Sequence, residues 1–187
     1  MNASILIDDF GFTNKAEVIL SPNFDNRPDH HIKLIVIHNI SLPPKVYGGN
    51  SIINLFTNKL NPNEHEYFKS IYDIKVSSHF LIRRDGQLIQ FVSCLNRAWH
   101  AGESIWKKIK NCNDFSIGIE LEGSDYDAFE EKQYISLNTL LDNLIRQYPI
   151  EDIVGHSDIA PLRKTDPGPY FDWDEIKSHK NELIRKR

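Results

Sequence analysis

The chain has 187 residues, of which 40% are hydrophobic and 26% are charged, and its formal net charge at pH 7 is −4. This composition is typical of a folded globular chain and excludes global disorder. The net acidity argues against a broad nucleic-acid-binding surface, which requires clustered Lys and Arg, so we expect no nucleic-acid partner. No apolar run approaches the ~20 residues of a membrane-spanning helix, so we expect no membrane partner either.

The length and the lack of internal repeats predict one domain over residues 1–187. The first twelve residues, MNASILIDDFGF, have neither a basic region nor a long apolar core, so they do not indicate a secretory signal. The two cysteines, Cys94 and Cys112, are too few for a disulfide framework. Both features predict a cytoplasmic location.

The first part of the chain predicts a buried strand followed by two short helices. Residues 34–37 read Leu-Ile-Val-Ile, which is typical of a strand buried on both faces. We expect this strand to end at His38-Asn39, where the sequence turns polar. Short helices are expected within residues 51–60 and near 64–72.

The middle of the chain predicts a hairpin and then irregular structure. Asp85-Gly86 lies between two β-type runs, residues 77–83 and 87–92, and this arrangement is a strong hairpin signal. Residues 97–102 read as a loop or a strand end. Residues 103–113 are polar, and we expect them to be a loop.

The last part of the chain predicts two more strands and two helices. Residues 115–122 alternate between apolar and polar, which is typical of a strand, and 130–148 carry apolar residues at the spacing of one helix face. A short strand over 152–156 and a loop over 161–169 follow. A last helix is expected to begin after Asp172 and to carry apolar residues as far as Ile184. These elements together predict a mixed α/β fold, with a central mixed β-sheet flanked by α-helices.

Two histidines at strand ends and one aspartate suggest a metal site. His38 and His156 each follow an apolar strand, where open α/β sheets build their sites, and Asp166 comes ten residues after His156. Two imidazoles and a carboxylate are a usual protein ligand set for catalytic zinc, with a fourth position open to water. The spacing alone also allows these histidines to be structural. Four other histidines compete as ligands: His30, His31, His79 and His100.

Two glutamates on the 115–122 strand leave several interpretations open. Glu120 and Glu122 share the polar face and lie roughly 6–7 Å apart, from a rise of ~3.3 Å per residue. A glutamate beside a catalytic zinc is the usual general base. The same spacing lies near the ~6.5–9.5 Å of an inverting glycosidase pair, so a muramidase is an alternative. An ordinary solvated strand face is a third interpretation.

Three further residues have a structural and a functional interpretation each. Lys164, two residues before Asp166, would stabilise an oxyanion if Asp166 binds a metal, and would otherwise be a surface lysine. Trp99 suits either stacking on a sugar or packing in the core. Cys112 has no base beside it in the sequence, so we expect a free thiol rather than a nucleophile.

Five sequence blocks, in one order, carry a resemblance to a known family. The chain resembles the zinc N-acetylmuramoyl-L-alanine amidases that cleave 1,6-anhydro-N-acetylmuramyl-L-alanine in bacterial cell-wall recycling. These amidases share a fold with peptidoglycan-recognition proteins, and the likeness runs from about residue 21 to 173. The blocks are VIHNISLPP at 36–44, SSHFLIRRDG at 77–86, RAWHAG at 97–102, CNDFSIGIELEG at 112–123, and GHSDIAP at 155–161 followed by RKTDPGP at 163–169.

The resemblance implies a peptidoglycan-recognition-protein-like amidase fold and one Zn²⁺ per chain. The zinc ligands of the family fall on His38, His156 and Asp166. The catalytic glutamate of the family falls on Glu120, which leaves Glu122 with a supporting or solvated role. Periodicity alone could not choose between the two glutamates.

The resemblance also implies a catalytic lysine and several substrate contacts. The catalytic lysine falls on Lys164, the substrate-contacting asparagine on Asn39, and a wall for the anhydromuramyl sugar on Trp99. Lys75 and Asn111 stand where the family carries arginines that grip the stem-peptide carboxylates. Lys75 keeps the charge without the bidentate fork, so it stays a candidate substrate-binding residue, whereas Asn111 loses the charge.

The implied reaction is zinc-dependent hydrolysis of the amide bond between the lactyl group of 1,6-anhydro-N-acetylmuramic acid and L-alanine. In it, Glu120 takes a proton from water and Lys164 stabilises the oxyanion. The expected partner is the anhydromuropeptide substrate, and we expect a monomer. The alternatives are a non-catalytic module that binds peptidoglycan fragments and a muramidase that uses Glu120 and Glu122. A third alternative, an exported zinc amidase, conflicts with the missing signal.

Overall fold

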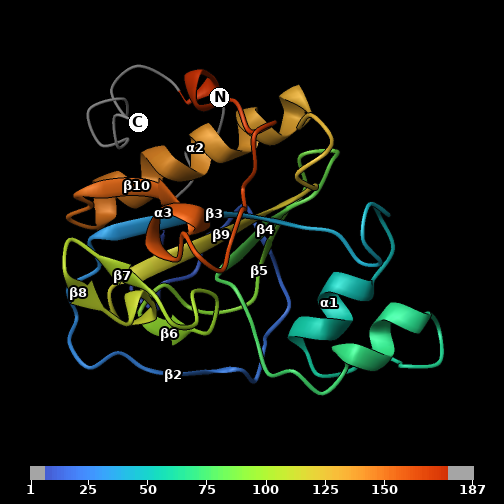
Figure 1. The fold of residues 1–187 in the computed structure, drawn as a ribbon. Helices are drawn as coiled ribbons and strands as arrows, with labels where there is room; N and C mark the ends of the chain where they lie inside the picture. The colour runs from blue at the N-terminus through green and yellow to red at the C-terminus, as the bar shows by residue number, and fades with distance from the viewer. Residues whose placement is uncertain (1–6, 177–187) are drawn as a thin grey trace.

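A six-stranded mixed sheet forms the centre of the computed structural model, which describes residues 7–176 (Figure 1). Its strand order is β1-β5-β4-β9-β3-β10. Strands β4, β9, β3 and β10 are parallel, and β5 runs antiparallel to β4, so the predicted mixed α/β class is confirmed. The strands are β1 Glu17–Val18, β3 Leu34–Ile40, β4 Phe80–Ile82, β5 Leu88–Gln90, β9 Ser116–Glu122 and β10 Asp152–Gly155.

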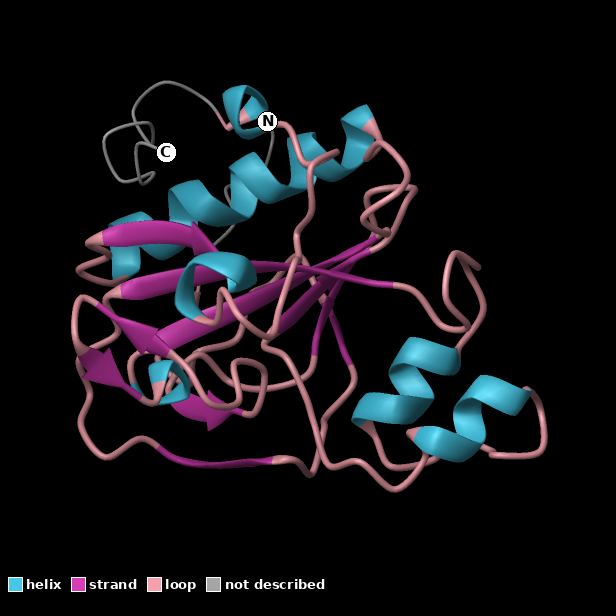
Figure 2. Ribbon diagram, viewed as in Figure 1, coloured by secondary structure: helices cyan, strands magenta, loops and turns pink. Residues whose placement is uncertain are grey.

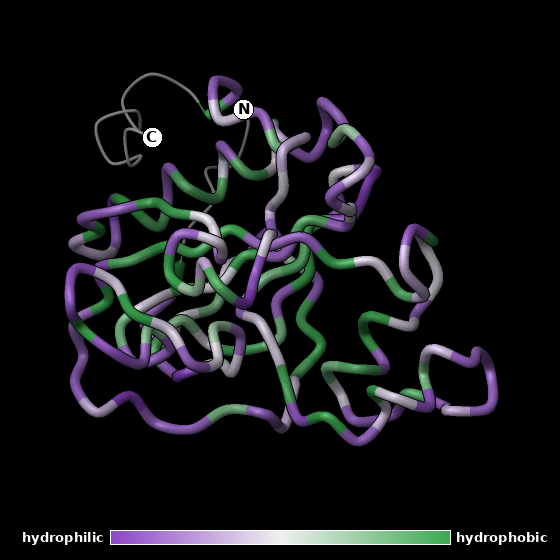
Figure 3. The backbone as a smooth tube through the Cα atoms, in the orientation of Figure 1, coloured by the Kyte–Doolittle hydropathy of each residue, from purple (hydrophilic) through white to green (hydrophobic). Residues whose placement is uncertain are grey.

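Helix α2, Glu131–Gln147, covers one face of this sheet, as predicted (Figure 1). Side chains alternate along a strand, so Ile35 and Ile37 of β3 belong to the same apolar cluster as α2. Leu34 and Val36 belong to a separate cluster on the opposite face. Figure 3 shows the hydrophobic colouring that runs along the central strands. Both faces of the sheet are therefore covered, which explains why β3 is apolar on both sides.

The opposite face is covered in part by α1, Ser51–Phe56, and the 3₁₀ helix η1, Glu66–Ser70. Figure 2 shows the two together beside the sheet. Phe56 and Phe68 pack in one apolar cluster with strand residues such as Leu81. Both short helices were predicted, although the second is a 3₁₀ helix.

The end of β3 differs from the prediction. The strand does not stop at His38 but continues to Ile40, because β9 runs beside it and offers partners as far as Glu122. His38 is therefore inside a strand rather than after one. The 85–86 hairpin, in contrast, is confirmed, with Gly86 in the left-handed region at φ +87° between β4 and β5.

Residues 103–113 were predicted as a loop, and this is wrong. Two short strands, β7 Ile105–Trp106 and β8 Ile109–Lys110, pair antiparallel there, followed by the 3₁₀ helix η2, Cys112–Asp114. The turn uses Lys107 and Lys108 at positive φ, a conformation that is usual for Gly or Asn, so the sequence carries no turn signal. Upstream, β2 Phe24–Asn26 pairs antiparallel with β6 Asn96–Ala98.

The chain after β10 begins with a short helix, α3 His156–Ile159, and then the predicted loop. The Asp172 side chain accepts a hydrogen bond from the Asp174 N–H at 2.9 Å, as expected of a cap, and within the described residues the 3₁₀ turn η3, Trp173–Glu175, follows it. The rest of the predicted last helix, including Ile184, lies outside the described residues. Within residues 7–176, no helix has the length and apolar character needed to span a membrane.

Candidate active site

The parallel pairing of β3 and β9 brings the first histidine beside a glutamate. His38 and Glu120 are register partners in neighbouring strands, so their side chains stand side by side on one face of the sheet. Because Ile37 and Ile119 point toward α2, His38 and Glu120 point to the opposite face. Both side chains are buried.

The second histidine, His156, follows strand β10, which lies beside β3 on the side opposite β9. Strand β10 runs parallel to β3 and ends at Gly155, which pairs with Ile37. His156, the next residue, begins α3, and this turn is held by the Asp158 carboxylate, which accepts from the Gly155 N–H at 2.8 Å. His156 therefore lies next to the His38 side chain at the end of its strand.

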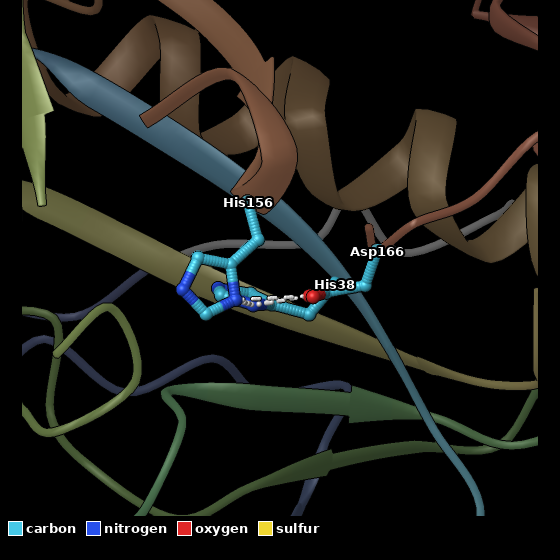
Figure 4. Close-up of side chains that lie close together, drawn as sticks. All are labelled: His38, His156 and Asp166. Carbon is cyan, nitrogen blue, oxygen red and sulfur yellow. Dashed lines mark hydrogen bonds and ion pairs between the residues drawn. The ribbon is translucent and has the colours of Figure 1, made fainter. Parts of the chain in front are cut away.

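The loop after α3 brings Asp166 to the two histidines. The Ser157 N–H donates to the Asp166 carbonyl at 2.9 Å, which holds the loop against α3. Three atoms then meet, since His38 Nδ1, His156 Nδ1 and Asp166 Oδ2 are each 3.0 Å from the other two. Figure 4 shows the three side chains pointing toward one another from β3, α3 and the loop.

Hydrogen-bond chemistry shows that this triangle suits a cation. His156 Nε2 lies 3.1 Å from the Ala101 carbonyl, which only accepts, so Nε2 carries a proton, and the neutral form of the ring has its Nδ1 lone pair facing the triangle. A lone pair and a carboxylate oxygen then face each other. A tetrahedral zinc with bonds of about 2.0–2.1 Å would separate its ligands by about 3.3 Å, close to the observed 3.0 Å. The donor set thus fits Zn²⁺.

The local electrostatics favour the charge state that binds a metal. Burial lowers the pKa of His38 to about 4 despite its contact with Asp166, so the imidazole is neutral at pH 7. Burial alone would raise the pKa of Asp166, but its close contacts with His156 and His38 lower it below the ordinary value. Neutral imidazole and ionised carboxylate are the forms in which these side chains bind Zn²⁺.

Glu120 is a buried carboxyl group with an unmatched oxygen. Among the described residues, Glu120 Oε2 has no hydrogen-bond partner. Burial, and then the negative charge of Asp166, raise its pKa well above the usual value, while the positive charge of Lys164 opposes this. Such a perturbed carboxyl group in a cavity is a candidate catalytic acid or base.

These groups share one cavity of about 430 Å³. Its polar end is formed by His38, Glu120, His156, Lys164 and Asp166. Its apolar wall includes Leu42, Phe56, Ile71, Val76 and Trp99. The half-buried Lys164 forms no ion pair with any described residue, so its ammonium group stays free to face a ligand in the cavity. The cavity has the size and mixed lining of a small-ligand site.

Asn39 also lines this cavity, but its amide nitrogen is already used. Nδ2 donates to Asp125 Oδ1 at 2.7 Å and to the Pro167 carbonyl at 3.0 Å. The Thr165 hydroxyl donates to the second oxygen of Asp125. Asn39 and Asp125 thus hold the loop that carries Asp166. The sequence offered no signal for Asp125, because only the folded loop brings it to residues 165–167.

The other predicted substrate residues differ in whether they line the cavity. Trp99 lines the cavity, whereas Lys75 and Asn111 are exposed and do not line it. Glu122 lies outside the cavity as well, and its carboxylate accepts from the Gly48 N–H at 2.6 Å and the Arg84 N–H at 3.2 Å. The two glutamates therefore face different surroundings, and the muramidase alternative loses its carboxylate pair.

The competing histidines and the cysteines lie outside the triangle. His79 Nδ1 accepts from the Gly118 N–H at 3.0 Å, and His30 and His31 are exposed. In the described part of the chain, the group able to hold a metal ion is His38, His156 and Asp166. Cys94 and Cys112 are both free and buried, and a free thiol was expected of Cys112.

Comparisons with known proteins agree with this geometry. The N-acetylmuramoyl-L-alanine amidase family (Amidase_2) matches residues 27–169. The 1,6-anhydro-N-acetylmuramyl-L-alanine amidase AmpD of Citrobacter freundii is 48% identical over 177 residues, which cover 93% of this chain and 94% of that protein. A crystal structure of a selenomethionine AmpD derivative superposes with a TM-score of 0.88 at 50% identity, over 90% of this chain and 96% of the other.

One further solved structure contains a substrate. It is described as a complex of the Escherichia coli N-acetylmuramyl-L-alanine amidase AmiD with anhydro-N-acetylmuramic acid-L-Ala-D-γ-Glu-L-Lys. It superposes with a TM-score of 0.57 at 28% identity, and the match covers 92% of this chain and 64% of that one.

Proposed function

The chain belongs to the N-acetylmuramoyl-L-alanine amidase family, and we propose that it is a zinc-dependent amidase of cell-wall recycling. The bond it cleaves joins the lactyl carbonyl of 1,6-anhydro-N-acetylmuramic acid to the L-alanine nitrogen of the stem peptide. One observation carries this proposal: three metal-donor atoms 3.0 Å apart share a cavity with a buried glutamate and a free lysine. The similarity to AmpD amidases supports the substrate class.

The proposed metal is Zn²⁺, held by His38, His156 and Asp166. When bound there, it supplies a Lewis acid that makes water more acidic and polarises the amide carbonyl. Two neutral imidazoles and one carboxylate leave such a centre at a net charge near +1. This positive charge would attract the carbonyl oxygen, and protein side chains would move the proton.

Glu120 is the proposed proton carrier. Its ionised carboxylate accepts a proton from the water that attacks the lactyl carbonyl carbon, and it returns a proton to the alanine nitrogen as the C–N bond breaks. The products are a lactyl carboxylate on the sugar and a peptide with a free amino terminus. The raised pKa of Glu120 suits the first of these steps, because a stronger base accepts the proton more readily.

Lys164 is the proposed stabiliser of negative charge. Lys164 lines the cavity with His38 and Glu120, and its positive charge acts on both of them. A fixed cation at this place favours the oxyanion that develops when the carbonyl carbon becomes tetrahedral. Trp99 and the apolar wall are proposed to receive the sugar, and Asn39 is proposed to position it.

The decisive experiment is mass spectrometry of the products formed from an anhydromuropeptide in oxygen-18-labelled water. We expect intact peptide and anhydro-sugar, with the label in the lactyl carboxylate. Chelation should stop the reaction and added zinc should restore it. Cleavage of a glycosidic bond instead, or full activity after complete metal removal, would overturn the proposal.

Variants of the two glutamates sharpen this experiment. Glu120→Gln should lower turnover by about 10²–10⁴-fold, and Lys164→Ala by about 10²-fold or more, while both keep zinc. Glu122→Gln is the matched control, because Glu122 stands on the same strand face as Glu120. Its amide oxygen can still accept from the Gly48 N–H. Equal losses in Glu120→Gln and Glu122→Gln would favour a carboxylate-pair mechanism over the amidase.

The remaining expectations stay predictions. Lys75 lies outside the cavity lining, so its proposed role in peptide binding would require contact with a part of the peptide beyond the cavity. Family membership favours a hydrolase over a non-catalytic binding module. The single domain, the cytoplasmic location and the monomeric state stay predictions too.

A further inference from the structure

His100 is held in a fixed place behind the candidate metal site. A Cβ atom on Gly118 would lie 2.5 Å from the His100 ring, so the ring packs directly on the backbone of β9. The backbone N–H groups of His100 and Ala101 both donate to Asn113 Oδ1, at 3.1 and 2.8 Å. Packing and hydrogen bonds therefore leave the imidazole, which is buried, little freedom to turn.

A chain of hydrogen bonds runs from His38 through this ring. His38 Nε2 lies 2.9 Å from His100 Nδ1, and His100 Nε2 lies 3.2 Å from Ser116 Oγ. The two histidine rings meet edge to face, with centroids 5.1 Å apart. His38 thus has one ring nitrogen in the donor triangle and the other against His100.

The direction of these bonds follows from the use of His38 Nδ1 as a ligand. A neutral imidazole that offers the Nδ1 lone pair to a metal carries its proton on Nε2, so His38 donates to His100 Nδ1. His100 must then accept at Nδ1 and carry its own proton on Nε2. This Nε2–H faces the Ser116 hydroxyl, which accepts it.

We propose that His100 is a positioning residue of the metal centre, which acts through His38. Its Nδ1 lone pair holds His38 in the tautomer and ring orientation that present Nδ1 to the metal, as outer partners of histidine ligands generally do. A neutral imidazole does this without adding charge, unlike a carboxylate partner. The inference rests on the proposed function, because it assumes the zinc site.

The two histidine ligands have different hydrogen-bond partners at Nε2, both from one short segment, and this supports the assignment. His156 donates its Nε2 proton to the Ala101 carbonyl, and His38 donates to His100, the residue immediately before Ala101. One short segment, residues 100–101, therefore orients both imidazoles of the donor triangle. Asn113 accepts from both N–H groups of this segment and so fixes it as a unit.

Two variants of His100 test the role of the acceptor. His100→Phe fills the space but cannot accept a hydrogen bond, whereas His100→Asn places Oδ1 where Nδ1 was. We expect His100→Phe to weaken zinc binding by about 10–100-fold in a chelator competition, and His100→Asn to weaken it by less than about tenfold. Ser116→Ala, which removes the outer bond alone, is the matched control and should resemble His100→Asn.

The melting temperature of each metal-free variant separates positioning from folding. A positioning role predicts that His100→Phe and His100→Asn melt within a few degrees of each other without metal, yet differ in zinc affinity. Equal zinc affinity in the two variants, or wild-type affinity in His100→Phe, would overturn the inference. If the wild-type protein itself binds no zinc, the proposed function fails instead.

Nitrogen-15 NMR of the zinc-loaded wild-type protein gives a test that needs no variant to fold. We expect the proton of His38 on Nε2, a proton-free His100 Nδ1, and the His100 proton on Nε2. A proton on His100 Nδ1 in the loaded protein would contradict the inference, whatever the variants show.

Discussion

Individual residues of the candidate site are held in states that cost stability. The Glu120 carboxyl group is buried with an unpartnered oxygen, and Asp166 adds negative charge nearby. Burying an unsatisfied polar group costs about 1–3 kcal/mol. The rest of the fold offsets this cost. Strand β9 is fully buried, and its register with β3 fixes the position of Glu120.

We predict that Glu120→Gln stabilises the metal-free protein at pH 7. The pKa of Glu120 is raised in the folded state, so its contribution to stability is fully present below the unfolded pKa and is lost as pH rises through the folded pKa. At pH 7 the neutral amide should gain about 1–3 kcal/mol, and near pH 4 the gain should vanish. Thermal unfolding without metal at both pH values checks this, and an equal gain at both would contradict it.

A second residue-scale prediction concerns the loop that carries Asp166. Asp125 accepts from Asn39 and Thr165, and Asp125→Ala removes both bonds. We expect zinc affinity to fall by about 10–100-fold, as for other partners that orient a ligand. Asp127→Ala is the control, because Asp127 binds Tyr47 and Ser124 and does not touch this loop. Chelator competition on both variants is the measurement, and similar affinities would refute the role of Asp125.

At the scale of elements, the sheet separates the α2 layer from the candidate site. Helix α2 packs on one face and the site is built on the other, so the two share strands but not side chains. The helix start is also tied to the sheet, since Gln133 Nε2 donates to the carbonyls of Ile82 and Glu122 at 3.2 and 3.0 Å. The Gln133 side chain also accepts from the Glu130 N–H, which caps the helix.

This separation predicts that a cavity under α2 changes stability without changing metal binding. Leu141 is fully buried in the α2 layer, so Leu141→Ala should lower the free energy of unfolding by about 2–5 kcal/mol. Zinc affinity of the folded variant should match the wild type, because the donor atoms lie on the far face of the sheet. Denaturant unfolding and chelator competition at low temperature measure the two effects, and a coupled loss would contradict the separation.

On the scale of the whole molecule, the candidate metal site joins distant parts of the chain. His38 lies 118 residues from His156 and 128 residues from Asp166. The donor atoms therefore come together only when β3, β10 and the loop after α3 are all in place. A ligand that binds only the folded chain shifts the unfolding equilibrium by mass action.

We therefore predict that zinc raises the melting temperature and that chelation reverses the change. Free zinc at 1,000 times its dissociation constant corresponds to about 4.1 kcal/mol of stabilisation. His38→Ala should fold without metal but lose the zinc-dependent shift, because it removes one of three donors. Calorimetry with and without zinc is the measurement, and an unchanged shift in this variant would place the metal elsewhere.

Much of this protein follows from its sequence, because periodicity and local motifs report local structure. The Leu34–Ile37 run predicted a buried strand, Asp85-Gly86 predicted the hairpin, and the apolar spacing over 130–148 predicted α2. The order of the motif blocks also identified the family. These signals depend on neighbours in sequence, which a single chain displays directly.

Only the tertiary structure decided which side chains share a cavity. Glu120 and Glu122 point to the same strand face, yet they separate because the loop after β3 brings the Gly48 N–H to Glu122 and leaves Glu120 beside His38. The contacts of Asp125 and His100 also join residues far apart in sequence. Sequence spacing sets the face on which a side chain stands. What it meets there depends on how distant strands and loops pack, and local patterns do not encode that.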